Sequence, residues 1–277
     1  MERYIRQISG KERYDGMDKE AWKLKLLTPS SWWGAKWREA LPTGSGTVGA
    51  AVYGGVHRET VMLTHGDLWW QSRTPDLPDI SGRLEEMRHL MLSGQEEKAE
   101  PMLVEELQRK DYDPAMAVPL PLGDLTIVSA VNEGFKLYSR ELDMQSGEVT
   151  VRWKDRGAAF ERALFASRPE DMIVMEMRAE GEGSVHARFS LGLHDPSDAK
   201  RPPGRPEAPL PVEVESGSDG SFIWYAARID DGSDFGAVAR IIPTGGGLKA
   251  EGTESVASGA EQVLVWAKGI WLSNASI

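Results

Sequence analysis

The sequence predicts an all-β fold, a large antiparallel β-sandwich with a short helical insertion near residues 81–110. The first observation is a series of short segments after Gly123 that are rich in β-branched and aromatic residues and recur at close, regular spacing. The second is the set of turn sequences between them, such as QSG at residues 145–147 and DRG at residues 155–157. Many short strands joined by tight turns are typical of a sandwich or barrel, and 277 residues suffice for one such domain.

Each predicted strand is a run of apolar and β-branched residues bounded by turn formers. Two segments in the first third of the chain, residues 47–56 and 59–70, are expected to form a hairpin with its turn at His57 and Arg58. The other predicted strands are residues 124–130, 135–143, 148–154, 158–166, 172–178, 184–193, 222–229, 235–242 and 262–268. The β pattern therefore extends over most of the chain.

The helical insertion is predicted from a change to helical periodicity. Ser81 is expected to cap a first helix that ends at Ser93 and Gly94, with an apolar stripe made of Leu84, Met87, Leu90 and Met91. A second helix has an apolar side made of Ala99, Met102, Leu103 and Leu107. Because proline removes a backbone donor and crowds the preceding turn, Pro101 predicts either a kink or a helix that begins near Glu100.

The domain organisation follows from the same patterns. Residues 1–21 are charged and lack clear periodicity, so we expect a loosely ordered lead-in. Residues 22–277 are expected to form a single β-sandwich domain. Residues 200–211 contain five prolines and predict a loop, after which the β pattern resumes unchanged.

The composition excludes several classes of partner and site. A formal net charge of −11 argues against a nucleic-acid partner, because phosphate groups require a concentrated basic face. The absence of cysteine excludes disulfides and thiolate metal sites. The first residues lack the apolar run of a signal peptide, and no segment reaches the roughly 20 apolar residues of a membrane span. We expect a cytoplasmic protein that has no membrane partner.

Two motif searches predict that the chain binds no cofactor and no metal. Residues 44–49, GSGTVG, match the dinucleotide pattern G-x-G-x-x-G, but Pro42 precedes them and the following residues predict a strand. That pattern needs a helix N-terminus after it, so these glycines are expected to form a turn. The five histidines form no H-x-H or H-E-x-x-H pair, the spacing that a zinc site would require.

One short segment combines several groups suited to substrate binding. His65, Asp67, Trp69 and Trp70 supply a titratable ring, a carboxylate and two surfaces on which a sugar could stack. At alternating positions, His65, Asp67 and Trp69 would share one strand face. The alternative is an ordinary polar strand end with packed indoles. No nucleophile elbow is present, and 43 acidic residues do not reveal a catalytic pair.

Four sequence pieces together resemble the amino-terminal domain of glycoside hydrolase family 95, the inverting α-L-fucosidases and related α-L-galactosidases. Their order and spacing hold from about residue 30 to 195. The pieces are WREALPTGSG (residues 37–46, with GA at 49–50 and GG at 54–55), LTHGDLWW (63–70), PLPLGDL (119–125), and YSRELD (138–143) with RALFAS (162–167). Ser45 stands where the family usually has Asn, and residues 64–66 replace Asn-Glu-Asp, so a different substrate preference is expected.

The resemblance implies a large β-sandwich of the supersandwich type, whereas the family's catalytic residues lie in a following (α/α)6 barrel. We expect that barrel to be absent from this chain, because the β pattern extends almost to Ile277. No catalytic residue is therefore carried over, and the chain alone is expected to be inactive. The implied partners are the barrel of a parent enzyme and carbohydrate, with the sandwich as a scaffold that lends a loop to the rim of the active site.

Two other functions remain open. A stand-alone carbohydrate-binding module would use Trp69, Trp70, Trp32 or Trp33 as stacking platforms. A self-sufficient small hydrolase would need two carboxyl groups roughly 6.5–9.5 Å apart in a pocket for inversion.

Overall fold

The computed structural model describes residues 22–30, 36–70, 78–112, 118–131, 134–195, 213–229 and 234–272. The nine-stranded sheet contains, in spatial order, β1 (Lys23–Leu26), β6 (Lys136–Asp143), β7 (Glu148–Asp155), β8 (Ala158–Ser167), β9 (Met172–Glu180), β16 (Gln262–Leu272), β13 (Asp234–Thr244), β12 (Phe222–Arg228) and β11 (Glu213–Ser218). The seven-stranded sheet contains β14 (Gly247–Glu251), β15 (Glu254–Ala260), β10 (Val185–Gly192), β5 (Val118–Ser129), β4 (Arg58–Trp70), β3 (Val48–Val52) and β2 (Leu41–Gly44). The helical elements are the 3-10 turns η2 (Lys36–Glu39) and η3 (Ser81–Arg83) and the helices α3 (Leu84–Leu92) and α4 (Glu96–Arg109).

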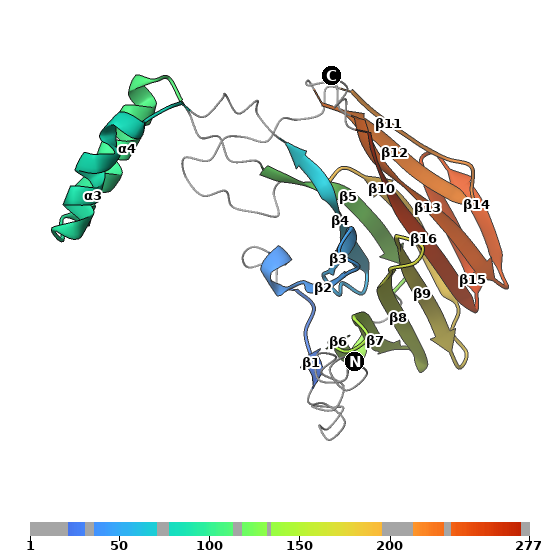
Figure 1. The fold of residues 1–277 in the computed structure, drawn as a ribbon. Coiled ribbons are helices and arrows are strands. Elements are labelled where there is room, and N and C mark those ends of the chain that lie inside the picture. Colours follow the sequence, from blue (N-terminus) through green and yellow to red (C-terminus); the bar gives the residue numbers. More distant parts are fainter. Residues whose placement is uncertain are drawn as a thin grey trace, which may run out of the picture. The chain divides into compact units, whose positions relative to one another are not determined.

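The chain divides into two compact units, residues 1–68 with 121–277, and residues 69–120. The first unit contains nearly all the strands, and Figure 1 shows its two sheets as two layers. Neighbouring strands pair antiparallel, as β13 does with β16 and β8 with β9. The predicted all-β antiparallel sandwich is confirmed. The predicted lead-in at residues 1–21 and the loop at residues 200–211 lie outside the described residues.

The core lies between the two sheets because alternate residues of each strand point inward. On β13 the buried apolar side chains are Phe235, Ala237, Ala239 and Ile241, and on β10 they are Val185, Ala187, Phe189 and Leu191. This period of two is the pattern from which the central strands were predicted. Two layers of such strands bury one continuous apolar interior.

The predicted strands after Gly123 correspond to β5 to β10, β12, β13 and β16, and the predicted hairpin is β3 with β4. Five strands were not predicted, and four of them, β1, β11, β14 and β2, are the edge strands of the two sheets. Edge strands are partly solvated, so they carry charged or turn-forming residues, as in KLKL of β1 and LPTG of β2. The signal that marks a buried strand is therefore weak in them.

The G-x-G-x-x-G segment forms the turn between β2 and β3, as predicted. The two strands pair antiparallel, and the backbone amide of Ser45 donates to the Val48 carbonyl oxygen at 2.9 Å. Gly46 has a φ of 104°, a conformation that glycine adopts without strain. No helix follows this turn, so the segment lacks the helix N-terminus that binds a pyrophosphate.

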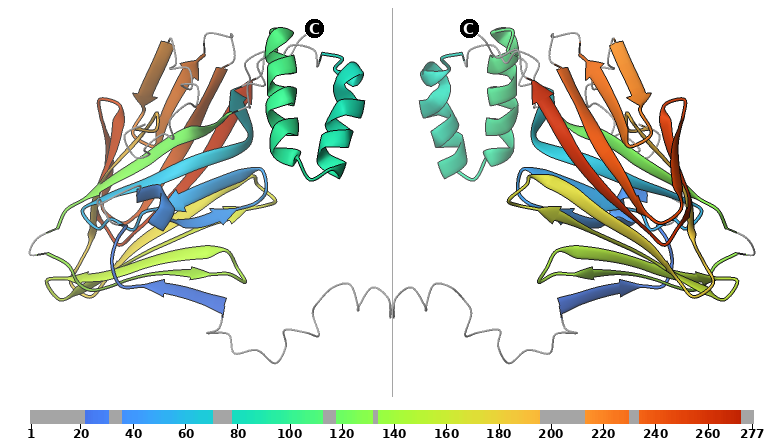
Figure 2. Two further views of the ribbon diagram at one scale, coloured as in Figure 1. Left: turned by 90° about the vertical axis from the view of Figure 1, so that its left-hand side faces the viewer. Right: turned by 90° about the vertical axis from the view of Figure 1, so that its right-hand side faces the viewer.

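Residues 69–120 contain the predicted helical pair, in which α3 and α4 lie side by side and antiparallel (Figure 2). The predicted cap of the first helix was wrong, and of the two alternatives predicted for Pro101 the later helix start was wrong, while the kink stays a prediction. Ser81 does not cap α3 but begins the η3 turn, where its backbone amide donates to Oδ1 of Asp79 at 2.8 Å. The second helix begins at Glu96 rather than near Glu100 and includes Pro101 in its interior. Among the described residues, neither helix is long and apolar enough to cross a bilayer.

Candidate functional site

The predicted site segment lies on the second half of β4, beside the turn between β2 and β3. The backbone amide of Gly66 donates to the Thr47 carbonyl oxygen at 2.7 Å, which attaches the segment to that turn. The side chain of His65 is 12% exposed and that of Asp67 is 76% exposed, and Nδ1 of His65 lies 4.0 Å from Oδ2 of Asp67. The backbone amide of Asp67 also donates to this Nδ1 at 3.2 Å.

The burial pattern of β4 changes phase within this segment. Glu59, Val61 and Leu63 are buried at alternate positions, but the next buried position is Leu68. Because five residues separate Leu63 from Leu68, strict alternation does not continue through the segment. His65 and Asp67 are therefore close together but differ greatly in exposure, and their role in substrate binding stays a prediction.

The structure describes the side chain of only one of the four predicted stacking tryptophans, Trp69. Trp69 and Trp70 are the last residues of β4 and belong to the unit of residues 69–120. Trp69 is exposed. The side chain of Trp70 lies outside the described part of the structure, as do Trp32 and Trp33.

The motif pieces that are far apart in the sequence meet in a buried polar cluster between the sheets. Its centre is an ion pair between Glu59 on β4 and Nη1 of Arg162 on β8, with both side chains almost completely buried. Oε1 of Glu59 accepts the backbone amides of Tyr53 and Gly54 at 3.0 and 2.9 Å. Nη2 of Arg162 donates to the Gly55 carbonyl oxygen at 3.1 Å. The pair therefore holds the loop between β3 and β4 in place.

Two residues of the YSRELD piece complete the cluster from β6. The Tyr138 hydroxyl donates to the Gly54 carbonyl oxygen at 2.7 Å. Arg140 donates through Nε to the Thr28 carbonyl oxygen at 2.8 Å and through Nη1 to Oγ of Ser30 at 2.9 Å. Burial raises the pKa of Tyr138, so its hydroxyl remains a donor. Tyr138 and Arg140 of the YSRELD piece therefore have a structural role, which is to fasten β6 to these backbone and side-chain groups.

The GDL piece on β5 forms a second polar contact. Oδ1 of Asp124 on β5 lies 2.8 Å from Nδ1 of His194, which lies after the end of β10. This contact joins the segment after β10 to β5. Gly123 has a φ of 140°, and a Cβ atom there would lie only 2.5 Å from the Tyr225 hydroxyl. Only glycine fits this position without strain. The motif thus reflects close packing between the sheets.

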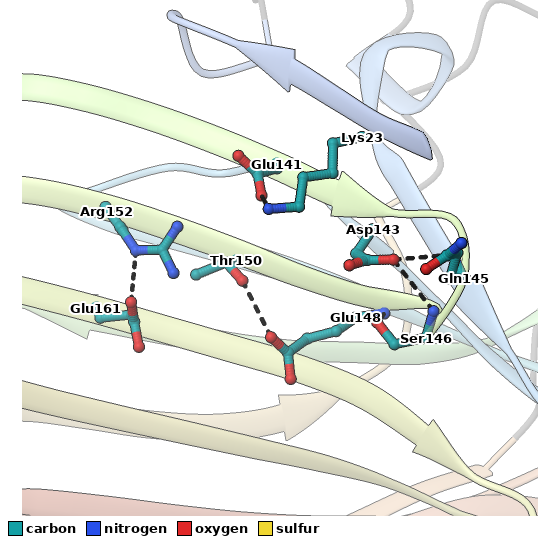
Figure 3. Close-up of polar contacts among 9 residues, drawn as sticks. All are labelled: Lys23, Glu141, Asp143, Gln145, Ser146, Glu148, Thr150, Arg152 and Glu161. Atoms are coloured by element: carbon teal, nitrogen blue, oxygen red, sulfur yellow. Dashed lines mark hydrogen bonds and ion pairs between the residues drawn. The ribbon is translucent and has the colours of Figure 1, made fainter. Parts of the chain in front are cut away.

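Polar side chains form a series of contacts over β1 and β6 to β8 of the nine-stranded sheet (Figure 3). Nζ of Lys23 lies 3.4 Å from Oε1 of Glu141, and Nε of Arg152 donates to Glu161 at 2.5 Å. Oδ1 of Asp143 accepts the backbone amides of Gln145 and Ser146 in the turn after β6, at 2.8 and 3.2 Å. These pairs are on solvated strands, and the described residues contain no group of three or more potential metal ligands.

The carboxyl group at the centre of the buried cluster has no exposure to solvent. A general acid must reach its substrate and have a pKa raised toward the working pH. Burial raises the pKa of Glu59. Its carboxyl group pairs with Arg162 and has no solvent-accessible surface, so a ligand in solution cannot contact it. The more exposed Asp234 on β13 has a lowered pKa because Arg228 donates to it. Neither carboxyl group meets both requirements.

A family model described as "Glycosyl hydrolase family 65, N-terminal domain" matches residues 26–269. The chain belongs to this family. A curated relative, Alpha-L-fucosidase 2 of Arabidopsis thaliana, is 25% identical over 256 residues, which are 84% of this chain and 28% of the relative. Among solved structures, a chain titled "Putative kojibiose phosphorylase from human microbiome" is 11% identical with a TM-score of 0.45, and the match covers 94% of this chain and 34% of that one.

The family model and the curated relative confirm the predicted resemblance to the amino-terminal domain of a fucosidase-like glycoside hydrolase. The family model is described under family 65, whereas the motif pieces resemble family 95, and the curated relative is named as a fucosidase. The chain spans 28% of the length of that relative.

Proposed function

We propose that this glycosyl hydrolase family 65 N-terminal domain is a non-catalytic scaffold, which packs against an (α/α)6 catalytic barrel of a parent enzyme that acts on carbohydrate. The family match supports this proposal, since the domain matched is amino-terminal and the curated fucosidase extends far beyond it. The burial of Glu59 and the lowered pKa of Asp234 also favour a non-catalytic role.

The observation that carries the docking role is the apolar surface of the helical pair. In α3 and α4 only Met87 and Ala99 are buried. Met91 and Leu92 are 62% and 89% exposed, and Leu84 and Val104 are also exposed. Two antiparallel helices leave part of their apolar surface open, and we infer that an additional surface covers it. The catalytic barrel of the parent enzyme is the proposed occupant.

An activity assay tests the non-catalytic role. The 277-residue chain should not release nitrophenol from nitrophenyl α-L-fucoside or nitrophenyl α-L-galactoside above the rate of a heat-inactivated sample. Turnover that is lost in Asp234→Asn or Glu213→Gln would overturn the proposal, because a carboxyl group of this domain would then be performing the chemistry.

Hydrogen exchange tests the docking role. The reading frame downstream of Ile277 should encode several hundred further residues of helical pattern, and the longer protein should exchange the amides of α3 and α4 more slowly than the 277-residue chain. Peptides from β13 and β16, which lie in the sandwich core, serve as the internal control. Leu92→Asp in the longer protein should remove the extra protection. Equal exchange of α3 and α4 in the two proteins would contradict docking.

A further inference from the structure

The outer face of the nine-stranded sheet changes character at its β11 end. Three aromatic side chains, Phe222 and Trp224 on β12 and Trp266 on β16, are about 40% exposed. Phe222 pairs across the strands with Arg240, and Arg240 pairs with Trp266, so these residues form one row across β12, β13 and β16.

Three contacts hold the aromatic rings in place. The Arg240 guanidinium lies 5.5 Å from the ring centroid of Phe222 and 6.0 Å from that of Trp266, within range of a cation–π interaction with each ring. The indole of Trp224 covers Gly217 on β11, where a Cβ atom would lie 2.8 Å from the ring. Gly217 therefore allows the indole to lie close to the sheet, with part of its surface open to solvent.

A hollow of about 280 Å³ lies over β11, β12 and β13 and begins at Ala226, one outward position along β12 from Trp224. Ala226, the next outward residue after Trp224, pairs with Gly236, and these two small residues leave the space empty. Glu213, Glu215, Arg228 and Asp234 also line the hollow. Nε of Arg228 donates to Oδ1 of Asp234 at 2.8 Å, and its Nη1 donates to Glu213 at 3.2 Å.

We propose that the aromatic row and this hollow form a binding site for a neutral saccharide, which goes beyond the scaffold role. The apolar C–H face of a pyranose would lie against Trp224, and its hydroxyl groups would exchange hydrogen bonds with Arg228 and the carboxylates. An arrangement of apolar and aromatic surface with a few fixed polar groups is typical of small-molecule sites.

The charged residues that line the hollow favour a neutral ligand over an anion or a metal cation. Three carboxylates surround one guanidinium, so an anionic ligand would be repelled. A metal cation is not favoured, because the described residues contain no cluster of three or more suitable ligands. A neutral ligand with many hydroxyl groups can both donate to the carboxylates and accept from Arg228.

Titration of the 277-residue chain tests the site. The probes are neutral oligosaccharides built from glucose, galactose, xylose and fucose, including lactose and 2′-fucosyllactose, with 3′-sialyllactose as the anionic counterpart. Tryptophan fluorescence and calorimetry should show binding of at least one neutral probe at about 1–10 mM, the range of a small exposed site. No binding across the neutral panel, or equally tight binding of 3′-sialyllactose, would overturn the proposal.

Variants locate the binding surface. Trp224→Ala and Ala226→Phe should each weaken binding about tenfold, the first by removing the platform and the second by filling the hollow. Phe165→Ala is the matched control, because Phe165 is 39% exposed on the same sheet but lies on β8, four strands away from Trp224 and the hollow. Phe165 is in register with Trp266 through Val174 of β9, at the far end of the row. This variant should bind as the native chain does. Circular dichroism should show that all three variants are folded.

Two outcomes would contradict the site. Binding that neither Trp224→Ala nor Ala226→Phe weakens would place the saccharide elsewhere. Self-association that Trp224→Ala abolishes, without sugar binding, would assign the surface to a second copy of the chain. Because these titrations require neither turnover nor a barrel, they can fail while the scaffold proposal holds, and the reverse is equally true.

Discussion

The carboxylate of Glu59 on β4 and the guanidinium of Arg162 on β8 form a buried ion pair that connects the seven-stranded sheet to the nine-stranded sheet. The two residues are 103 positions apart in the sequence. The guanidinium also lies 5.4 Å from the ring centroid of Trp153 on β7. Since both charges are removed from water, each depends on the other and on the backbone groups around them.

Removing the cation of this pair should strongly destabilise the domain. In Arg162→Met the carboxylate of Glu59 would stay buried without its partner, and we expect a loss of about 3–5 kcal/mol in the free energy of unfolding. Urea denaturation measures this loss. The control is Arg178→Met, which removes an arginine whose side chain is 45% exposed and pairs with Glu161, and should cost less than about 1 kcal/mol. If both variants lost a similar amount of free energy of unfolding, burial would not be what makes the Glu59–Arg162 pair important for stability.

The same pair should make stability depend on pH. Burial raises the pKa of Glu59 above its ordinary value of 4.5, although Arg162 and three backbone amides oppose the shift. The folded state therefore holds this proton more tightly than the unfolded state. The contribution of Glu59 to stability is then greatest below pH 4.5 and declines as the pH rises through the folded-state pKa.

Glu59→Gln removes the ionisable carboxyl group, so comparing this variant with the native chain isolates the contribution of Glu59 to the pH dependence of stability. The free energy of unfolding of the native chain minus that of Glu59→Gln should fall as the pH rises from 4.5 upward, in urea denaturation at a series of pH values. Glu161→Gln, at a partly exposed carboxylate, corrects for the general effect of removing one charge. A difference that rises with pH would show that the folded-state pKa is lowered instead.

The glycine of the loop after β3 should not tolerate a side chain. A Cβ atom at Gly55 would overlap the carbonyl oxygen of Arg58 and lie 2.9 Å from its carbonyl carbon. We expect Gly55→Ala to cost at least about 2 kcal/mol, because backbone must move to make room. Gly82→Ala is the control, since open space surrounds its Cβ position. Thermal unfolding of the two variants should differ accordingly, and equal melting temperatures would disprove the overlap.

Replacement of the proline inside α4 should stabilise that helix. Pro101 cannot donate to the carbonyl oxygen of Glu97, one turn earlier, and proline costs roughly 3 kcal/mol in a helix interior relative to alanine. Pro101→Ala should therefore slow hydrogen exchange in α4. Glu105→Ala, at another exposed position of the helix, should change exchange only slightly. Faster exchange in Pro101→Ala would indicate that the proline has a packing role.

The central strands could be predicted because apolar and polar residues alternate along them, which is the pattern of a strand buried on one face. In β12 and β13 every second side chain is apolar and buried, so the pattern appears in the sequence. The edge strands β1 and β14 face water along one side and lack that pattern. The cap of α3 was assigned to the wrong residue because serine also suits the η3 turn that precedes the helix.

The candidate sites divide in the same way. His65 and Asp67 could be predicted as candidates because they are chemically suited to binding and lie close together in the sequence. Trp224, Ala226 and Arg228 could not, because a hollow beside an aromatic platform exists only when β11, β12 and β13 lie next to one another. The pairing of strands, which local sequence does not reveal, creates this surface.

The residue pattern alone was enough to establish the β-sandwich, the helical pair and the relationship to amino-terminal domains of glycoside hydrolases, because periodicity and short motifs are local properties. Folding decided which distant residues meet. Glu59, Tyr138 and Arg162 come together only when two sheets stack, since a buried charge requires its partner to arrive from another strand.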